Sequence, residues 1–123
     1  MRRVEFANSA TRKYCERVVG DERCRLAVDV YVHRLAAAIA SMAAALGGLD
    51  ALAFTAGVGE GSARLRALAA QRLAFLGVEV DPSANHAAAE DAVISPPGAR
   101  VTTLVIRARE DLEIARQVRT LLA

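Results

Sequence analysis

The sequence predicts an α/β fold, a mixed sheet flanked by helices. Apolar residues recur at helical spacing in three stretches. Between these stretches lie two strong apolar runs of strand length, residues 51–55 and 100–106. Because helices separate the runs, we expect strands joined by right-handed crossovers. The 123 residues suffice for one domain and are too few for two.

The N-terminal part divides into an irregular segment and a long predicted helix. Residues 1–20 show little periodicity, so we treat them as a poorly defined segment and residues 21–123 as the folded part. Helical spacing begins at Glu22 and stops at Gly47. Residues 36–45 are almost wholly apolar, which predicts burial on more than one side of this helix.

The stretch that follows is the strongest candidate for a binding site. Residues 51–55 predict a strand buried in a sheet that is covered on both faces. Glycine then recurs at every second position, and Ser62 begins a segment with helical spacing. Glycines allow close approach to a ligand, and the first amides of a helix attract anions. We expect this glycine turn, residues 57–62, to bind the phosphates of a nucleotide. An ordinary strand-to-helix turn is the alternative, since Gly57-x-Gly59 is neither a P-loop nor a complete dinucleotide motif.

Weaker signals follow the glycine turn. Helical spacing from residue 62 to residue 75 predicts a second helix that ends at Gly77. Its basic residues are expected on the outer face: Arg64, Arg66 and Arg72. Residues 78–80 and 93–95 predict short strands, and residues 81–85 have the composition of a turn.

The last predicted helix runs from Glu110 to Leu122, directly after the strand at residues 100–106. Its inner face is expected to hold the apolar residues Leu112, Ile114, Ala115, Val118 and Leu121. If the two strong strands are neighbours, Glu110 and Asp111 lie near the glycine turn. A carboxylate beside bound phosphates is a usual setting for Mg²⁺. Favourable charge at a helix N-terminus explains the same residues equally well.

Composition argues against several other classes of function. The net charge is +2 with both signs interspersed, so we expect no nucleic-acid partner. No run of eighteen apolar residues and no signal peptide are apparent, so we expect no membrane partner. Cys15 and Cys24 lack metal-type spacing and fit free thiols in the cytoplasm. A lone helical histidine such as His33 is more often structural than a ligand.

Three stretches together resemble the C-terminal third of acetate kinases. They are LAVDVYVHRL at residues 26–35, LDALAFTAGVGEGS at residues 49–62 and VIRAREDLEIAR at residues 105–116. Residues 75–81 and 93–95 also fit, so the resemblance covers residues 21–123 in order. It implies the C-terminal nucleotide-binding part of a ribonuclease-H-like, actin-like ATPase domain. It also implies Mg²⁺-dependent phosphoryl transfer between ATP and acetate, which gives acetyl phosphate.

The resemblance also implies roles for single residues. The nucleotide, ATP or ADP, is expected to contact Gly57, Val58, Gly59, Glu60 and Gly61. Glu110 matches the family's Mg²⁺-binding carboxylate, and Arg2 matches an adenosine-binding segment. Two positions depart from the family pattern: Ala56 stands where glycine is usual, and Gly61 where asparagine is usual.

The resemblance also implies what this chain lacks. In acetate kinases the acetate-binding arginine, the transition-state arginine and the catalytic aspartate lie upstream of the matched part. We therefore expect no catalytic residue in this chain, and acetate binding only together with the missing upstream domain. A non-catalytic nucleotide-binding or protein-interaction module is the alternative, as is a relative of propionate or butyrate kinases. Bare apolar surfaces would favour a homodimer or association with a complementary kinase fragment.

Overall fold

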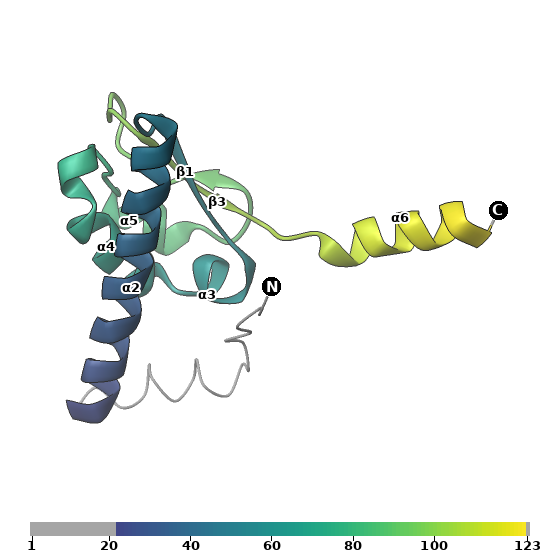
Figure 1. Cartoon of the computed structure of the whole chain (residues 1–123), viewed down its shortest axis with the longest axis horizontal. Helices are drawn as coiled ribbons and strands as arrows, with labels where there is room; N and C mark the ends of the chain where they lie inside the picture. The colour runs from purple at the N-terminus through teal and green to yellow at the C-terminus, as the bar shows by residue number, and fades with distance from the viewer. Residues whose placement is uncertain (1–21, 123) are drawn as a thin grey trace.

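The computed structural model describes residues 22–122, so the expectations for Arg2 and Cys15 lie outside it. These residues form the predicted mixed α/β fold around a three-stranded sheet of order β1-β3-β2 (Figure 1). Strand β1 (Ala51–Thr55) pairs in parallel with β3 (Thr102–Ile106), and β2 (Ala92–Val93) pairs antiparallel with β3. The two strong strands are therefore neighbours, although β3 and not β1 is the central strand.

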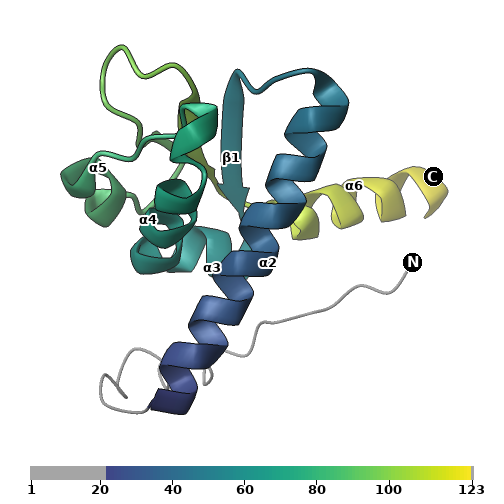
Figure 2. The same ribbon diagram turned by 60° about the vertical axis from the view of Figure 1, so that its left-hand side comes forward.

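The long helix α2 (Glu22–Leu46) confirms the first predicted helix. It ends where Gly47 takes a φ of +74°, a left-handed conformation that glycine adopts without strain. Val32, Ala36 and Ala43 are buried, and the small alanine side chains let α2 lie close to α4 (Figure 2). Within residues 22–122 the opposite side of α2 is exposed, so the expected burial on more than one side is not found.

By length and composition alone, helix α2 is long and apolar enough to cross a membrane, with a mean hydropathy of 1.3 over an 18-residue window, although the sequence analysis identified no such segment. A core helix of a soluble protein meets the same criterion. Its buried residues belong to the core that α2 forms with α4 and the sheet.

The second predicted helix is present but interrupted. Helix α4 (Ala63–Arg72) begins at Ser62, whose hydroxyl accepts a hydrogen bond of 3.3 Å from the Leu65 N–H. A short 3-10 helix, η1 (Ala74–Leu76), follows and ends at Gly77, where φ is +86°. A Cβ at this position would lie 2.9 Å from Arg100 Cδ, so both the backbone and its neighbour require glycine.

The region between residues 78 and 95 differs most from expectation. Residues 82–87 form helix α5 (Pro82–Ala87), whereas the sequence predicted a turn at residues 81–85. The helix forms because Asp81 caps it, accepting a 2.7 Å hydrogen bond from the Ala84 N–H, and proline suits the first helical position. Residues 78–80 form no strand, since only Val78 bridges to Val101. Strand β2 lies one residue before the predicted one.

The core lies on one face of the sheet only. Leu52 and Phe54 of β1, with Val101 and Val105 beside them, face the helices α2 and α4 (Figure 2). On the opposite face of the sheet four side chains are exposed: Ala51, Ala53, Thr55 and Thr102. The expected cover on both faces is therefore not provided by residues 22–122, which also leave β1 as an edge strand.

Helix α6 (Glu110–Leu122) has the predicted bounds but not the predicted environment. It extends away from the sheet (Figures 1 and 2), and all its described residues are exposed. The five apolar residues expected to face inward are therefore exposed too: Leu112, Ile114, Ala115, Val118 and Leu121. Spacing predicts which residues share a helix face, and here no described element covers that face.

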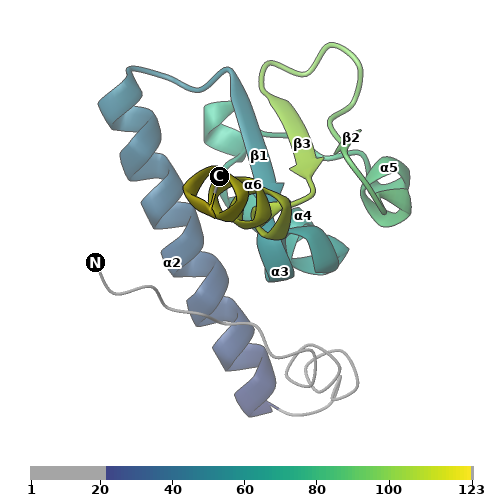
Figure 3. The same ribbon diagram turned by 90° about the vertical axis from the view of Figure 1, so that its right-hand side faces the viewer.

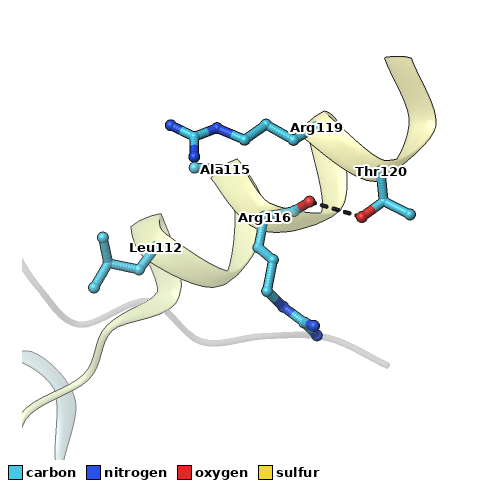
Figure 4. A pocket seen from close by; sticks show the side chains of 5 residues that line it. All are labelled: Leu112, Ala115, Arg116, Arg119 and Thr120. Carbon is cyan, nitrogen blue, oxygen red and sulfur yellow. Dashed lines mark hydrogen bonds between the residues drawn. The ribbon is translucent and has the colours of Figure 1, made fainter. Parts of the chain in front are cut away.

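A shallow hollow on α6 does not qualify as a binding site. It is lined by Leu112, Ala115, Arg116, Arg119 and Thr120 (Figure 4). All five residues belong to this one helix, so within residues 22–122 no second element closes the hollow. A ligand there would remain largely in water, and we place the candidate site elsewhere.

Candidate functional site

The candidate site lies where the two parallel strands end. Thr55, the last residue of β1, pairs with Ile106, the last residue of β3. Figure 3 shows the two strands side by side. The chain leaves β1 directly into residues 57–61, here called the glycine segment. It leaves β3 through residues 107–109, here called the linker, and reaches Glu110 at the start of α6. The expected meeting of both segments at the carboxyl edge of the sheet is confirmed, and this edge is where α/β folds bind ligands.

The glycine segment is helical, whereas the sequence predicted an open turn. Residues 56–61 form helix α3 (Ala56–Gly61), and the Ser62 N–H donates to the Val58 carbonyl at 3.1 Å. Gly59 permits this packing, because a Cβ there would lie 3.3 Å from the carbonyl carbon of Phe54. One glycine is thus explained by contact with the end of β1. In the first turn of α3, the Ala56 N–H donates to Glu60 Oε1, whereas the N–H groups of Gly57 and Val58 have no main-chain partner within the helix.

Ala56 begins this helix in a left-handed conformation, with φ at +58°. It is the one non-glycine residue of the described chain with a positive φ. An L side chain in this region costs about 1–2 kcal/mol. The departure from the glycine that is usual in acetate kinases therefore leaves backbone strain next to the site.

We expect Ala56→Gly to stabilise the chain by about 1 kcal/mol, since the relief of strain exceeds the extra backbone entropy of glycine. In thermal unfolding this corresponds to a midpoint about 4 °C higher. Ala38→Gly is the matched control, because Ala38 is exposed within α2. There the same substitution is expected to cost about 1 kcal/mol. An unchanged or lower midpoint for Ala56→Gly would contradict the assigned strain.

Arg66 was expected on the outer face of α4 and is instead buried, with 2% of its surface exposed. Its Nη1 donates to the carbonyl oxygens of Gly59 and Glu60, both at 2.8 Å. Its Nε donates to Asn85 Oδ1 at 2.6 Å, and Nη2 to the Asn85 carbonyl at 2.7 Å. Asn85 Nδ2 in turn donates to the Ala63 carbonyl at 2.8 Å. Arg66 therefore joins the end of α3 to α5.

The sequence does contain a signal for the burial of Arg66, although the basic character of this residue favoured an exposed position. Arg66 lies three, four and seven residues before Ala69, Ala70 and Leu73, all of which are buried. This spacing puts Arg66 on the inner stripe of α4. Burial lowers the pKa of the Arg66 guanidinium, and its five N–H donors suit a site rich in carbonyl oxygens.

Two carboxylates hold the linker. Glu60 Oε1 accepts hydrogen bonds from the Ala56 N–H at 2.8 Å and from the Ala108 N–H at 2.6 Å. Asp91 Oδ1 accepts from the Arg107 N–H at 2.8 Å, and its Oδ2 pairs with Arg109 Nη2 at 2.8 Å. The hydrogen bonds from Arg107 and Arg109 hold the pKa of Asp91 below its usual range. Sequence reasoning missed Asp91, because no local pattern connects it with the linker.

Glu110 lies two residues after Ala108, with its side chain exposed. Among residues 22–122 no three histidine, cysteine or acidic side chains gather as a metal site. A cation held mainly by protein side chains is therefore not supported in this part of the chain. Mg²⁺ fits better, because it often binds one or two carboxylates and completes its shell with water and phosphate oxygens.

The fold and the site define a recognisable class. It is a mixed α/β fold in which helices pack on the sheet and two segments meet at the carboxyl edge of that sheet. Comparison with solved structures agrees. The acetate kinase of Porphyromonas gingivalis superposes with a TM-score of 0.79 at 33% identity, covering 90% of this chain and 29% of that one. A propionate kinase from Francisella tularensis superposes with a TM-score of 0.74 at 31% identity, covering 84% of this chain and 27% of that one.

Sequence comparison identifies the family. Residues 3–116 match the acetokinase family. The acetate kinase of Gloeobacter violaceus is 52% identical over 98 residues, which cover 80% of this chain and 24% of the relative. The acetate kinase of Leifsonia xyli is 50% identical over 99 residues, which cover 80% of this chain and 25% of the relative. The chain therefore belongs to the acetokinase family, a family of kinases, and it spans about a quarter of the length of these relatives.

Proposed function

We propose that this chain forms the nucleotide side of an acetate kinase, an enzyme that transfers a phosphoryl group between ATP and acetate to give acetyl phosphate. One observation carries the proposal: β1 and β3 end side by side, so that the glycine segment and the start of α6 leave the sheet at one edge. Membership of the acetokinase family supports the same assignment.

Each matched residue has a proposed task. By the resemblance, Gly57, Val58, Gly59, Glu60 and Gly61 contact the phosphates of ATP or ADP. The N–H groups of Gly57 and Val58, in the first turn of α3, are the main-chain donors that remain available for them, and the start of a helix suits anions. Glu110 holds Mg²⁺ together with phosphate oxygens. The bound ion offsets the negative charge of the phosphates. Arg2, by its resemblance, contacts the adenosine.

Glu110→Gln tests this assignment through nucleotide affinity. We expect Mg²⁺ to tighten ADP binding to the wild-type chain by about tenfold, on the order of one charge-assisted contact. Titration calorimetry with and without Mg²⁺ should show that Glu110→Gln loses this difference and keeps the affinity for metal-free ADP. Glu79→Gln, at an exposed glutamate in another part of the chain, is the matched control and should behave as wild type.

The outcomes separate the candidate functions. An unchanged effect of Mg²⁺ in Glu110→Gln would remove Glu110 from the metal site. If wild type binds no nucleotide under either condition, the alternative of a non-catalytic protein-interaction module is favoured. The exposed apolar face of α6 is the observation that supports that alternative. The similarity to a propionate kinase leaves a longer acyl substrate as a further variant of the kinase proposal.

We also propose what covers the exposed apolar surfaces of the chain and where in the cell the chain is located. We infer that a complementary part of an acetate-kinase fold or a second copy of the chain covers the apolar face of α6 and the outer face of β1. Acetate would bind only with that complementary part, since the family's acetate-binding residues lie outside the matched region. We propose a cytoplasmic location with α2 in a protein core, and neither nucleic acid nor membrane as partner.

A further inference from the structure

We propose that Glu60 is a positioning residue. Its side chain accepts hydrogen bonds from the backbone after β1 and from the backbone of the linker, and this link fixes the place of Glu110 relative to the glycine segment. The link itself is read from the contacts of Glu60. Its consequence for magnesium-nucleotide binding rests on the function proposed above.

The link consists of one carboxylate oxygen and two main-chain donors. Glu60 Oε1 accepts from the Ala56 N–H at 2.8 Å, directly after β1. It also accepts from the Ala108 N–H at 2.6 Å, two residues after β3. Hydrogen bonds to an ionised carboxylate are short and stronger than neutral ones. Because both donors belong to the backbone, the bonds fix the course of the chain and not merely a side-chain rotamer.

Glu60 itself is held firmly enough to serve this purpose. Its carbonyl oxygen accepts a 2.8 Å hydrogen bond from the buried Arg66 guanidinium. The position of the Glu60 main chain is therefore tied to α4 and α5 through Arg66 and Asn85. The side chain of Glu60 extends from this fixed point to the linker.

The start of α6 depends on such contacts because α6 has no buried face within the described part of the chain. No residue of α6 in the described chain is buried, so apolar packing does not set the position of Glu110. The linker is held by Glu60 at Ala108 and by Asp91 at Arg107 and Arg109. Asp91 lies just before β2, on the far side of β3. Of these two carboxylates, only Glu60 connects the linker to the glycine segment.

The geometry requires an acceptor oxygen at position 60 and not a negative charge there. Glu60→Gln preserves an oxygen of the same reach, whereas Glu60→Ala removes it. We expect amide exchange at Ala56 and Ala108, measured by NMR, to become about tenfold faster in Glu60→Ala, in line with the loss of one to two hydrogen bonds. In Glu60→Gln both rates should stay within about threefold of wild type.

Nucleotide affinity supplies the second measurement. Glu60→Ala should weaken ADP binding by about tenfold in the presence of Mg²⁺ and little in its absence, because the metal carboxylate is displaced while the phosphate donors remain. Ala108→Pro removes the donor at the other end of the link in an exposed linker and should reproduce this pattern. It also serves as the test variant if Glu60→Ala does not fold. Glu79→Ala is the matched control.

The exchange rates decide the proposal independently of nucleotide binding. Unchanged protection of the Ala108 amide in Glu60→Ala would overturn the link. Equally fast amide exchange in Glu60→Gln and Glu60→Ala would also overturn the proposed link, since the negative charge of Glu60 would then be required. If wild type binds no nucleotide, the proposed function fails, whereas faster exchange at Ala108 in Glu60→Ala still establishes the link.

Discussion

Replacing Arg66 with alanine is expected to lower the free energy of unfolding by about 3–5 kcal/mol, because several hydrogen bonds to oxygen acceptors are lost and a cavity is left. The guanidinium is 2% exposed and donates to Gly59, Glu60 and Asn85. Alanine would leave the buried Asn85 oxygens and the partly buried carbonyl oxygens of Gly59 and Glu60 without this donor, and would open a cavity among α3, α4 and α5. Domains of this size have only about 5–15 kcal/mol of stability, so the loss is a large share.

Urea unfolding followed by circular dichroism measures this effect. Arg66→Lys keeps the charge but cannot span three residues with a single ammonium, so we expect a loss between wild type and Arg66→Ala. Arg64→Ala is the matched control, because Arg64 is an exposed arginine two residues earlier on the same helix. It should change stability by less than about 0.5 kcal/mol. Equal midpoints for Arg66→Ala and Arg64→Ala would contradict the assigned role.

Local patterns were sufficient for the elements with strong periodicity. The bounds of α2, β1 and α6 agree with the sequence analysis, because clear apolar spacing is bounded by glycines or by charged residues. The sequence left open whether β1 and β3 are neighbours, and the structure shows that they pair in parallel. The meeting of two segments at the carboxyl edge could therefore be predicted from sequence only on the condition that these strands are neighbours.

The internal contacts of the site could not be predicted in the same way. Glu60 and Ala108 are 48 residues apart, and no spacing within either segment indicates that they meet. Glycine content predicted an open turn, but tertiary packing of Gly59 against the end of β1 allows a helix there. The exposure of α6 was missed for a related reason. A helix pattern predicts an apolar face, whereas the surface that covers this face has to come from another part of a protein.

The purified chain is expected to show no detectable phosphoryl transfer from ATP to acetate. Phosphoryl transfer depends on positioning both reactants and on stabilising charge with several groups at once. Residues 22–122 offer the glycine segment and Glu110 at one edge of the sheet. We expect the acetate-binding and transition-state groups to lie outside the part of an acetate kinase that this chain matches, since the match covers 24% of the acetate kinase of Gloeobacter violaceus.

Trapping acetyl phosphate with hydroxylamine provides the assay. A full-length acetate kinase under the same conditions is the positive control, and the chain without acetate gives the background. Loss of the transition-state groups alone is expected to slow transfer by about 10³-fold or more. Turnover close to that of the full-length enzyme would contradict the prediction and would require catalytic groups within this chain. Because binding and transfer are measured separately, a chain that binds ADP with Mg²⁺ yet makes no acetyl phosphate would support the nucleotide-side assignment. A chain that neither binds ADP nor makes acetyl phosphate would support the alternative of a protein-interaction module.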